Sequence, residues 1–216
     1  MEHPFAGQLE VANNGYAGII DPEAYVNDRY HGRWTLKRSV QIEGVPVLLQ
    51  RQFENGKNNC TLTSITAIFR FYRDHGYANI PDDVTQIQED VREIAFRHHF
   101  KDEKGTPPTQ IATIITKLWK RYGYDGRGSS RYLWKWSTFE RELKAGRPFV
   151  LNMANGFYKN HSVTGVGYLQ FEKRGFPDVI LLAVLDNRSK DVRYIDFNEF
   201  NFWGSITRVH PPATRP

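Results

Sequence analysis

The sequence has 216 residues, of which 40% are hydrophobic and 14% aromatic, and it carries a formal net charge of +5. A chain of this length and composition is long enough for one globular domain and too apolar to be disordered. Its single cysteine excludes an internal disulfide and any zinc site built from several cysteines. No apolar run approaches the ~20 residues of a membrane span, and the start, MEHPFAGQLEV, shows no secretory signal. Lysines and arginines are scattered, so we expect no nucleic-acid surface.

The N-terminal residues 1–40 are rich in glycine, asparagine and aromatic residues and have weak periodicity. We predict that they form an extension of loops and short elements on a main domain of residues 41–216. Whether the extension is a removable pro-segment stays open, as does the compartment in which the chain works. The segment VPVLLQRQF, residues 45–53, is predicted to be a strand.

Three helices are predicted in the next part of the chain. Segment 60–75 has apolar residues at helical intervals of three and four and ends at a His-Gly stop. The stretch IPDDVTQIQEDVREIAFRHHF opens with Pro81 and two aspartates, which favour a helix N-terminus. Residues 106–124 fit a further helix, with Thr106 as its cap and Gly123 near its stop.

The last part of the chain changes from helices to strands. A short helix is predicted at 137–148, with Ser137 and Glu140 as a capping box and Gly146 past its end. The predicted strands that follow are 148–153, 161–171, 179–186 and 192–197. Helices followed by strands are typical of an α+β fold.

The single cysteine, Cys60, lies where polar turn-forming residues give way to the first of these helices. Asn58 and Asn59 are placed to cap the helix. A helix N-terminus carries partial positive charge and free N–H groups, which favour the nucleophilic thiolate. A lone cysteine is more often a small buried hydrophobe, so both interpretations stay open.

A thiolate nucleophile works best beside an imidazole that later protonates the leaving amine. Of the seven histidines, His161 opens a predicted strand, and Gly165 and Gly167 after it allow another backbone to approach closely. His98 and His99 lie in a charged stretch that indicates a solvated helix end, and no third residue is spaced to form a metal site with them. We therefore expect neither a metal nor a cofactor.

An imidazole base needs an acceptor that orients it, and acyl transfer needs oxyanion donors. Asp186 ends an apolar strand and is the first candidate acceptor, with Asn187 as the alternative. Both residues also fit simple turn chemistry. The backbone N–H of Cys60 is one oxyanion donor, and an upstream side-chain amide, Gln52 or Gln50, is the other candidate.

Three stretches, QRQFENGKNNCTLTSITAIFRFY, ELKAGRPFVLNM and FYKNHSVTGVGYL, carry a family resemblance. Their order resembles that of papain-like cysteine peptidases, and within them the bacterial branch related to the bacteriocin-leader peptidases that cut after a double glycine. The resemblance implies an N-terminal helical part, with the cysteine at a helix start, packed on a C-terminal antiparallel sheet. It implies that Cys60 is the nucleophile, His161 the general base and acid, Asp186 the orienting residue and Gln52 the oxyanion donor.

The sequence departs from that family at three places. Thr61 stands where glycine or asparagine often follows the cysteine, Asn187 stands where proline usually follows the aspartate, and the N-terminal stretch has no clear counterpart.

The leading hypothesis is a thiol hydrolase that cleaves peptide or amide bonds in a peptide or protein substrate. An acyltransferase of the transglutaminase kind would use the same residues and pass the acyl group to an amine. A non-catalytic binding module is the third hypothesis. Its groove would be lined by Arg131, Tyr132, Trp134, Lys135 and Trp136, which fit core or interface packing equally well. The oligomeric state is not predicted.

Overall fold

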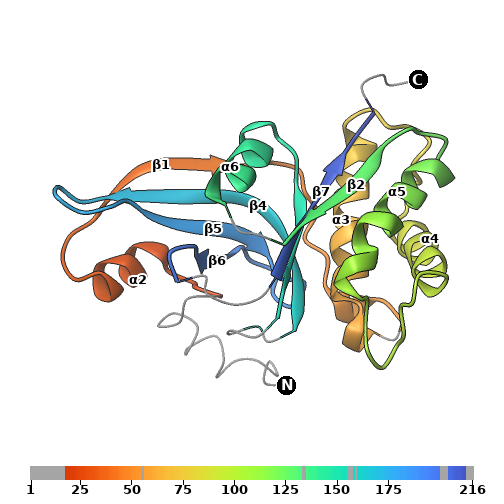
Figure 1. Ribbon diagram of the computed structural model, residues 1–216, viewed down its shortest axis with the longest axis horizontal. Coiled ribbons are helices and arrows are strands. Elements are labelled where there is room, and N and C mark those ends of the chain that lie inside the picture. The colour runs from red at the N-terminus through yellow and green to blue at the C-terminus, as the bar shows by residue number, and fades with distance from the viewer. Residues whose placement is uncertain are drawn as a thin grey trace.

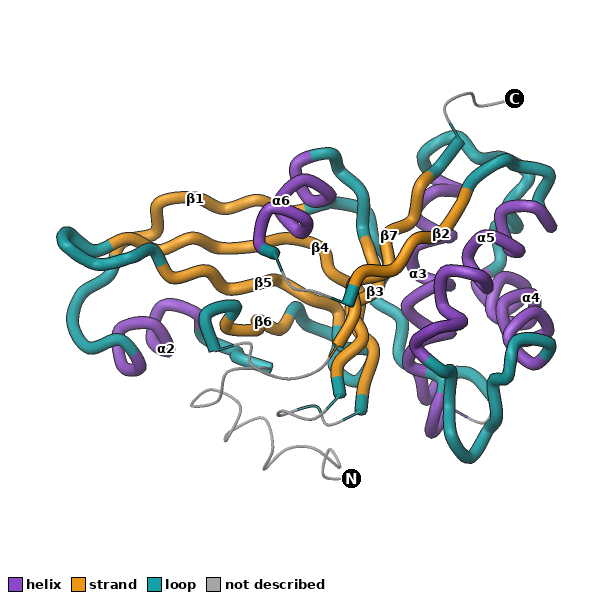
Figure 2. Tube along the Cα trace, viewed as in Figure 1, coloured by secondary structure: helices purple, strands orange, loops and turns teal. Residues whose placement is uncertain are grey.

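The computed structural model describes residues 18–54, 56–132, 135–154, 158, 160–199 and 204–212. Within these residues, five α-helices accompany a seven-stranded antiparallel sheet, so the predicted α+β fold is confirmed. Three of the helices gather on one side of the molecule, and the long strands extend to the other (Figures 1 and 2).

Most helices lie in the middle of the chain and most strands in its last third. The helices are α2 (Pro22–Arg29), α3 (Cys60–Asp74), α4 (Val84–Phe96), α5 (Ile111–Arg121) and α6 (Trp136–Lys144). The strands are β1 (Thr35–Gln41), β2 (Arg127–Arg131), β3 (Phe149–Met153), β4 (His161–Glu172), β5 (Val179–Leu185), β6 (Arg193–Asp196) and β7 (Gly204–His210). Short 3₁₀ turns occupy Gln50–Gln52, Gly56–Asn58 and Pro108–Gln110.

The long strand β4 organises the sheet, whose order is β2-β7-β3-β4-β5-β6 with β1 also paired to β4. Along one edge of β4, His161 to Gly165 pair with β3 and Gly167 to Glu172 pair with β1. The other edge pairs with β5. Because β3 ends at the level where β4 begins, the first residues of β4 lie at an end of the sheet, next to α3.

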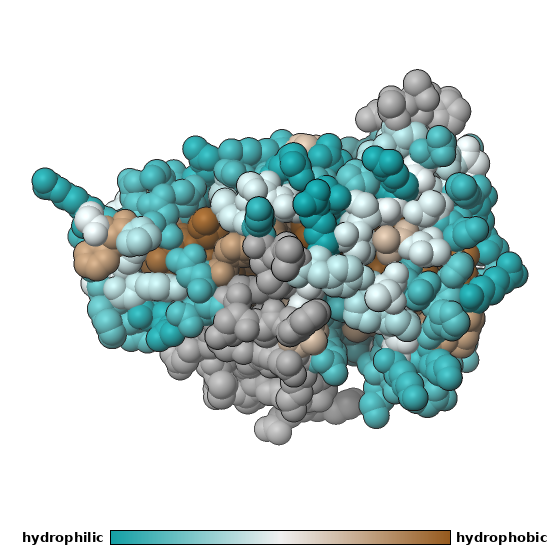
Figure 3. All heavy atoms as spheres, viewed as in Figure 1, coloured by the Kyte–Doolittle hydropathy of each residue, from teal (hydrophilic) through white to brown (hydrophobic). Residues whose placement is uncertain are grey.

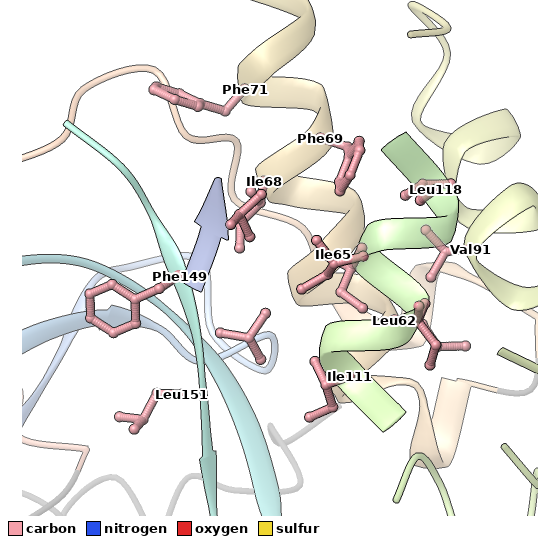
Figure 4. Packing of buried hydrophobic residues seen from close by; sticks show 14 of the residues in the cluster. Leu62, Ile65, Ile68, Phe69, Phe71, Val91, Ile111, Leu118, Phe149 and Leu151 are labelled. Carbon is pink, nitrogen blue, oxygen red and sulfur yellow. The ribbon is translucent and has the colours of Figure 1, made fainter. Parts of the chain in front are cut away.

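The main core lies between the sheet and the helices. In Figure 4, side chains of α3 point toward β3 on one side and toward α4 and α5 on the other. Phe69 and Trp119 pack with ring centroids 4.7 Å apart, and both are fully buried. The labelled core residues include Leu62, Ile65, Ile68, Val91, Ile111, Leu118, Phe149 and Leu151. Burial of α3 on two faces fixes the position of its first turn, where Cys60 lies.

The N-terminal helix α2 docks on the far part of the sheet through a buried carboxylate. Asp196 of β6 accepts hydrogen bonds from the hydroxyls of Tyr25 (2.9 Å) and Tyr30 (2.7 Å). Burial raises the pKa of Asp196, although these hydrogen bonds act against that rise. The predicted division of the chain at residue 40 falls within β1, which is a strand of this same sheet.

The predicted helices are present, with differences at their N-termini. The helix predicted from Pro81 begins at Val84, where the Asp83 side chain accepts the N–H of Thr85. The third helix begins after a 3₁₀ turn, so Thr106 is not its cap. The predicted capping box of α6 is absent, since its N-cap is Lys135 and no side chain bonds there.

The strand prediction was wrong for residues 45–53. This stretch joins no ladder: it runs without regular structure to Leu49 and then makes a 3₁₀ turn, which the side-chain oxygen of Gln52 closes by accepting the Leu49 N–H at 3.1 Å. The four strands predicted after residue 148 are present as β3 to β6. The prediction missed β1, β2, β7 and α2.

The two glycines of β4 have different neighbours. A Cβ on Gly167 would lie 2.3 Å from the backbone oxygen of Val40 in β1, so close backbone approach is confirmed there. A Cβ on Gly165 would lie 2.2 Å from the ring of Phe149, so that glycine makes room for a side chain instead. The pairing of β4 with β5 is irregular between these two positions.

Figure 3 shows that hydrophilic residues cover most of the visible face outside the grey atoms. In the part of the chain that the structure describes, no helix is both long and apolar enough to cross a membrane.

Candidate active site

Cys60 is the first residue of α3 and is partly exposed. Asn59 is the N-cap residue of α3, and its carbonyl accepts the N–H of Thr63, but neither predicted asparagine caps the helix through its side chain. The Asn59 amide donates to the Glu54 carbonyl at 2.9 Å, and the Asn58 amide donates to the Asp102 carbonyl at 2.5 Å. These bonds hold the segment before the helix in place. The first N–H groups of α3 have no partner inside the helix, and that of Thr61 bonds the sulfur.

His161 opens β4 and is buried, with only 2% of its surface exposed. Its Nε2 lies 2.7 Å from the backbone carbonyl oxygen of Asp186. A carbonyl only accepts, so Nε2 carries a proton and donates it. The ring bonds the Cys60 thiol as well, and Nδ1 is the nitrogen left for that contact. The structure thus brings Cys60 and His161 together. The hydrogen bond from Nε2 to the Asp186 carbonyl fixes the orientation of the ring.

The environment of the sulfur stabilises its charged form. Burial is the largest single influence and raises the pKa of Cys60. The charge of the His161 ring, the hydrogen bond from it and the backbone N–H groups of Ser162 and Thr61 together outweigh burial and lower the pKa to about 7. A substantial fraction of Cys60 is therefore thiolate at neutral pH.

We expect alkylation of Cys60 by iodoacetamide to reach half its maximal rate near pH 7, because only the thiolate reacts and its pKa is about 7. An unperturbed thiol would give a midpoint near ~8.5. Since Cys60 is the only cysteine, the total labelling measured by mass spectrometry reports on this site alone. A rate that rises only above about pH 8 would contradict an activated thiol.

The carboxylate of Asp186 faces the turn that follows β5 and makes no hydrogen bond to His161. Its Oδ1 accepts from the backbone N–H groups of Arg188 (3.0 Å) and Ser189 (2.8 Å), and from the Ser189 hydroxyl (2.9 Å). Its Oδ2 accepts from the buried hydroxyl of Tyr158 at 3.3 Å. The structure therefore brings the backbone of Asp186 to His161, and the carboxylate shapes the turn.

Asn187 joins the two elements that carry the cysteine and the histidine. Its backbone is in the left-handed region at φ 61°. Its Nδ2 donates within 3.0 Å to the carbonyl oxygens of Cys60 and Ser162 and within 2.8 Å to the hydroxyl of Ser64. Its own carbonyl accepts the N–H of Gln50 at 2.9 Å. Asn187 thus fixes the first turn of α3 against the start of β4.

Neither predicted glutamine lines the cleft beside Cys60. The exposed Gln52 uses its side-chain oxygen to accept the Leu49 N–H, and Gln50 donates from Nε2 to the Lys57 carbonyl at 3.3 Å. The structure does not bring these side chains to the sulfur.

A polar chain that the sequence did not reveal lies beside the sulfur. The buried hydroxyl of Thr61 is 2.8 Å from that of Ser162, which donates to the Asn152 side-chain oxygen at 2.9 Å. The three residues come from α3, β4 and β3. Thr61, which differs from the residue usual in the family, thus bonds the helix to the sheet.

The cleft next to Cys60 and His161 has a volume of about 430 Å³. Its walls come from the start of α3, the loop between α4 and α5, and the facing ends of β3 and β4. Of the predicted binding-module residues, the half-buried Trp136 packs on Tyr168 and Phe197 at the edge of the core, and Trp134 lies outside the described residues. None of the described members of that set lines this cleft. No group of three potential metal ligands occurs among the described residues.

Residues 42–205 match the model of the Peptidase_C39 like family. The chain belongs to this family. The predicted resemblance to papain-like cysteine peptidases is thereby confirmed, and the α+β fold agrees with a papain-like domain of the C39 type. Membership of this Peptidase_C39 like family suggests cysteine peptidase activity on peptide substrates. A search of curated proteins returned no match. The helix α2 and strand β1 precede the matched region.

Proposed function

We propose that this chain is a thiol hydrolase that cleaves peptide or amide bonds, with Cys60 as nucleophile and His161 as general acid and base. The observation that carries the proposal is the arrangement around His161. Its Nε2 is tied to the Asp186 carbonyl at 2.7 Å, and the ring bonds the partly exposed Cys60, whose pKa is lowered to about 7. A thiolate beside an imidazolium is suited to acyl transfer.

In the first half of the reaction, Sγ of Cys60 attacks the carbonyl carbon of the substrate. A C–S bond forms, and the carbonyl π electrons move to the oxygen. When this intermediate collapses, the C–N bond breaks and Nδ1–H of His161 gives its proton to the departing amine. The product is a thioester on Cys60 and a neutral imidazole.

In the second half, Nδ1 of His161 takes a proton from water as the water oxygen attacks the thioester carbon. The C–S bond then breaks, which releases the acid and restores the thiolate–imidazolium pair. Asp186 acts as the orienting residue in this scheme through its backbone carbonyl. A carbonyl holds Nε2–H in both halves, so the ring keeps its orientation while Nδ1 exchanges the proton.

The developing oxyanion needs hydrogen-bond donors. The backbone N–H of Cys60 is the proposed first donor, since an N–H at the start of α3 has no acceptor inside the helix. Gln52 remains the predicted side-chain donor. It would have to leave its contact with Leu49 and turn toward the cleft to act.

The acyltransferase alternative uses the same residues and differs only in whether water or an amine takes the acyl group from Cys60. The proposal favours water because the cleft is open to solvent.

The test is digestion of a peptide library in heavy-oxygen water, with and without an added primary amine. Hydrolysis places one heavy oxygen in each new carboxyl group, whereas transfer gives an amide of the added amine. We expect labelled acids from the parent protein and none from Cys60→Ala. Predominant amide products would favour the acyltransferase. Equal cleavage by Cys60→Ala would show that this thiol is not the nucleophile.

A further inference from the structure

Basic side chains line the cleft beside Cys60, and they are gathered mainly on one wall. His99, Lys101 and Lys104 contribute to one wall, and His161 lies at the floor. No aspartate or glutamate is among the described residues that line the cleft. The wall with the cations is the loop between α4 and α5, which lies at the lower edge of the helical part in Figure 1, where Figure 3 shows a hydrophilic surface.

The basic side chains of this wall are available to a ligand. Lys101, Lys104 and His99 are exposed. None of the three takes part in the ion pairs that the described residues form. Other exposed basic residues of the chain do pair, such as Lys37 with Asp178 and Lys144 with Glu140. A lysine without an ion pair can bind an anionic group without breaking an ion pair inside the protein.

The two carboxylates between these lysines in the sequence do not line the cleft. Asp102 pairs with Arg92 at 2.7 Å, and its carbonyl accepts the Asn58 amide, which anchors the loop to the segment before Cys60. Glu103 is exposed but does not line the cleft. The anchored loop therefore presents its lysines to the same cleft that Cys60 lines.

We propose that this cleft selects acidic peptide segments, with aspartate or glutamate side chains within a few residues of the attacked bond. The proposal rests on the hydrolase function above and specifies its substrate. Ion pairs at exposed positions change affinity by about two- to fivefold each, and salt weakens them. Two lysines together thus give a preference of roughly tenfold at low salt.

Binding tests this preference without turnover. The protein is Cys60→Ala, and the probes are two pools of capped decapeptides, random in neutral residues, that carry either glutamate or glutamine at the same fixed positions. Equilibrium dialysis and mass spectrometry measure how much of each pool is retained. We expect about tenfold greater retention of the glutamate pool at low salt, and a smaller difference at high salt. The matched control is Lys117→Glu, since Lys117 is an exposed lysine of α5 outside the cleft.

The outcomes separate the possibilities. The double change Lys101→Glu and Lys104→Glu should abolish the preference for the glutamate pool, and Lys117→Glu should leave it. Equal retention of both pools by Cys60→Ala with its lysines unchanged, or an unchanged preference in the double variant, would overturn the proposal. Tighter binding of a single-stranded DNA oligomer than of the glutamate pool would assign the cations to nucleic acid and also overturn it. If acidic peptides bind this site but the protein with Cys60 intact cleaves no peptide, the hydrolase function fails instead.

Discussion

Replacement of His161 by alanine is expected to reduce peptide hydrolysis by several orders of magnitude, on the order of 10⁴-fold. The change removes the group that protonates the leaving amine and activates water. It also removes the two largest influences that lower the pKa of Cys60, while the burial that raises this pKa remains. The midpoint of alkylation should therefore move from near pH 7 to above the ~8.5 of a free thiol. Initial rates of hydrolysis and the pH profile of iodoacetamide labelling measure both effects.

The matched control for this prediction is His99→Ala. His99 also lines the cleft but is exposed and is not among the groups that shift the pKa of Cys60, so its loss should leave the alkylation profile unchanged. Because His161 is buried, His161→Ala should lower the melting temperature as well as the rate. An unchanged alkylation profile in folded His161→Ala would remove this residue from the proposed mechanism.

Sequence patterns predicted the elements that have strong internal signals. The helix α3 and the strands β4 and β5 have long apolar stretches, and each is present near its predicted bounds. The strand β2, RGSSR, has no apolar alternation and exists because it pairs with β7. The false strand at residues 45–53 had suitable side chains, but no neighbouring backbone pairs with it. Strands depend on partners far away in the chain, which local composition does not show.

The candidate site was predictable to a similar degree. Cys60 and His161 stand at the junctions of regular elements, which are visible in the sequence. The acceptor for His161 is a backbone carbonyl, and every residue carries one, so no sequence pattern identifies it. The lysines of the cleft wall come from a loop about forty residues after Cys60, and only the fold brings them to the sulfur.

The second large effect concerns Asp186 and Asn187, for which the sequence favoured the carboxylate of Asp186 as the orienting group. In the structure, its backbone carbonyl has that contact, and the carboxylate holds the following turn. Asparagine at position 186 keeps the carbonyl and a side-chain oxygen that accepts the same N–H groups. We therefore expect Asp186→Asn to retain hydrolysis to within about tenfold, because its main acceptor contacts persist. Asp186→Ala should lose both rate and thermal stability, since the buried turn loses its acceptor.

Asn187→Gly is expected to be the more damaging change to catalysis, by about 100-fold, comparable to the loss of other groups that position a reacting pair. Glycine adopts φ 61° without strain, so this variant removes only the amide that bonds Cys60, Ser64 and Ser162. Without that amide, the first turn of α3 is less firmly held against β4, and the contact between Cys60 and His161 weakens. The alkylation midpoint should then rise above pH 7, which a purely structural loss elsewhere would not cause. Rates, melting temperatures and alkylation profiles of Asp186→Asn and Asn187→Gly, measured side by side, decide the matter. If Asp186→Asn is the inactive variant and Asn187→Gly keeps both its rate and its alkylation midpoint, then the carboxylate orients His161 and the clamp at Asn187 is dispensable.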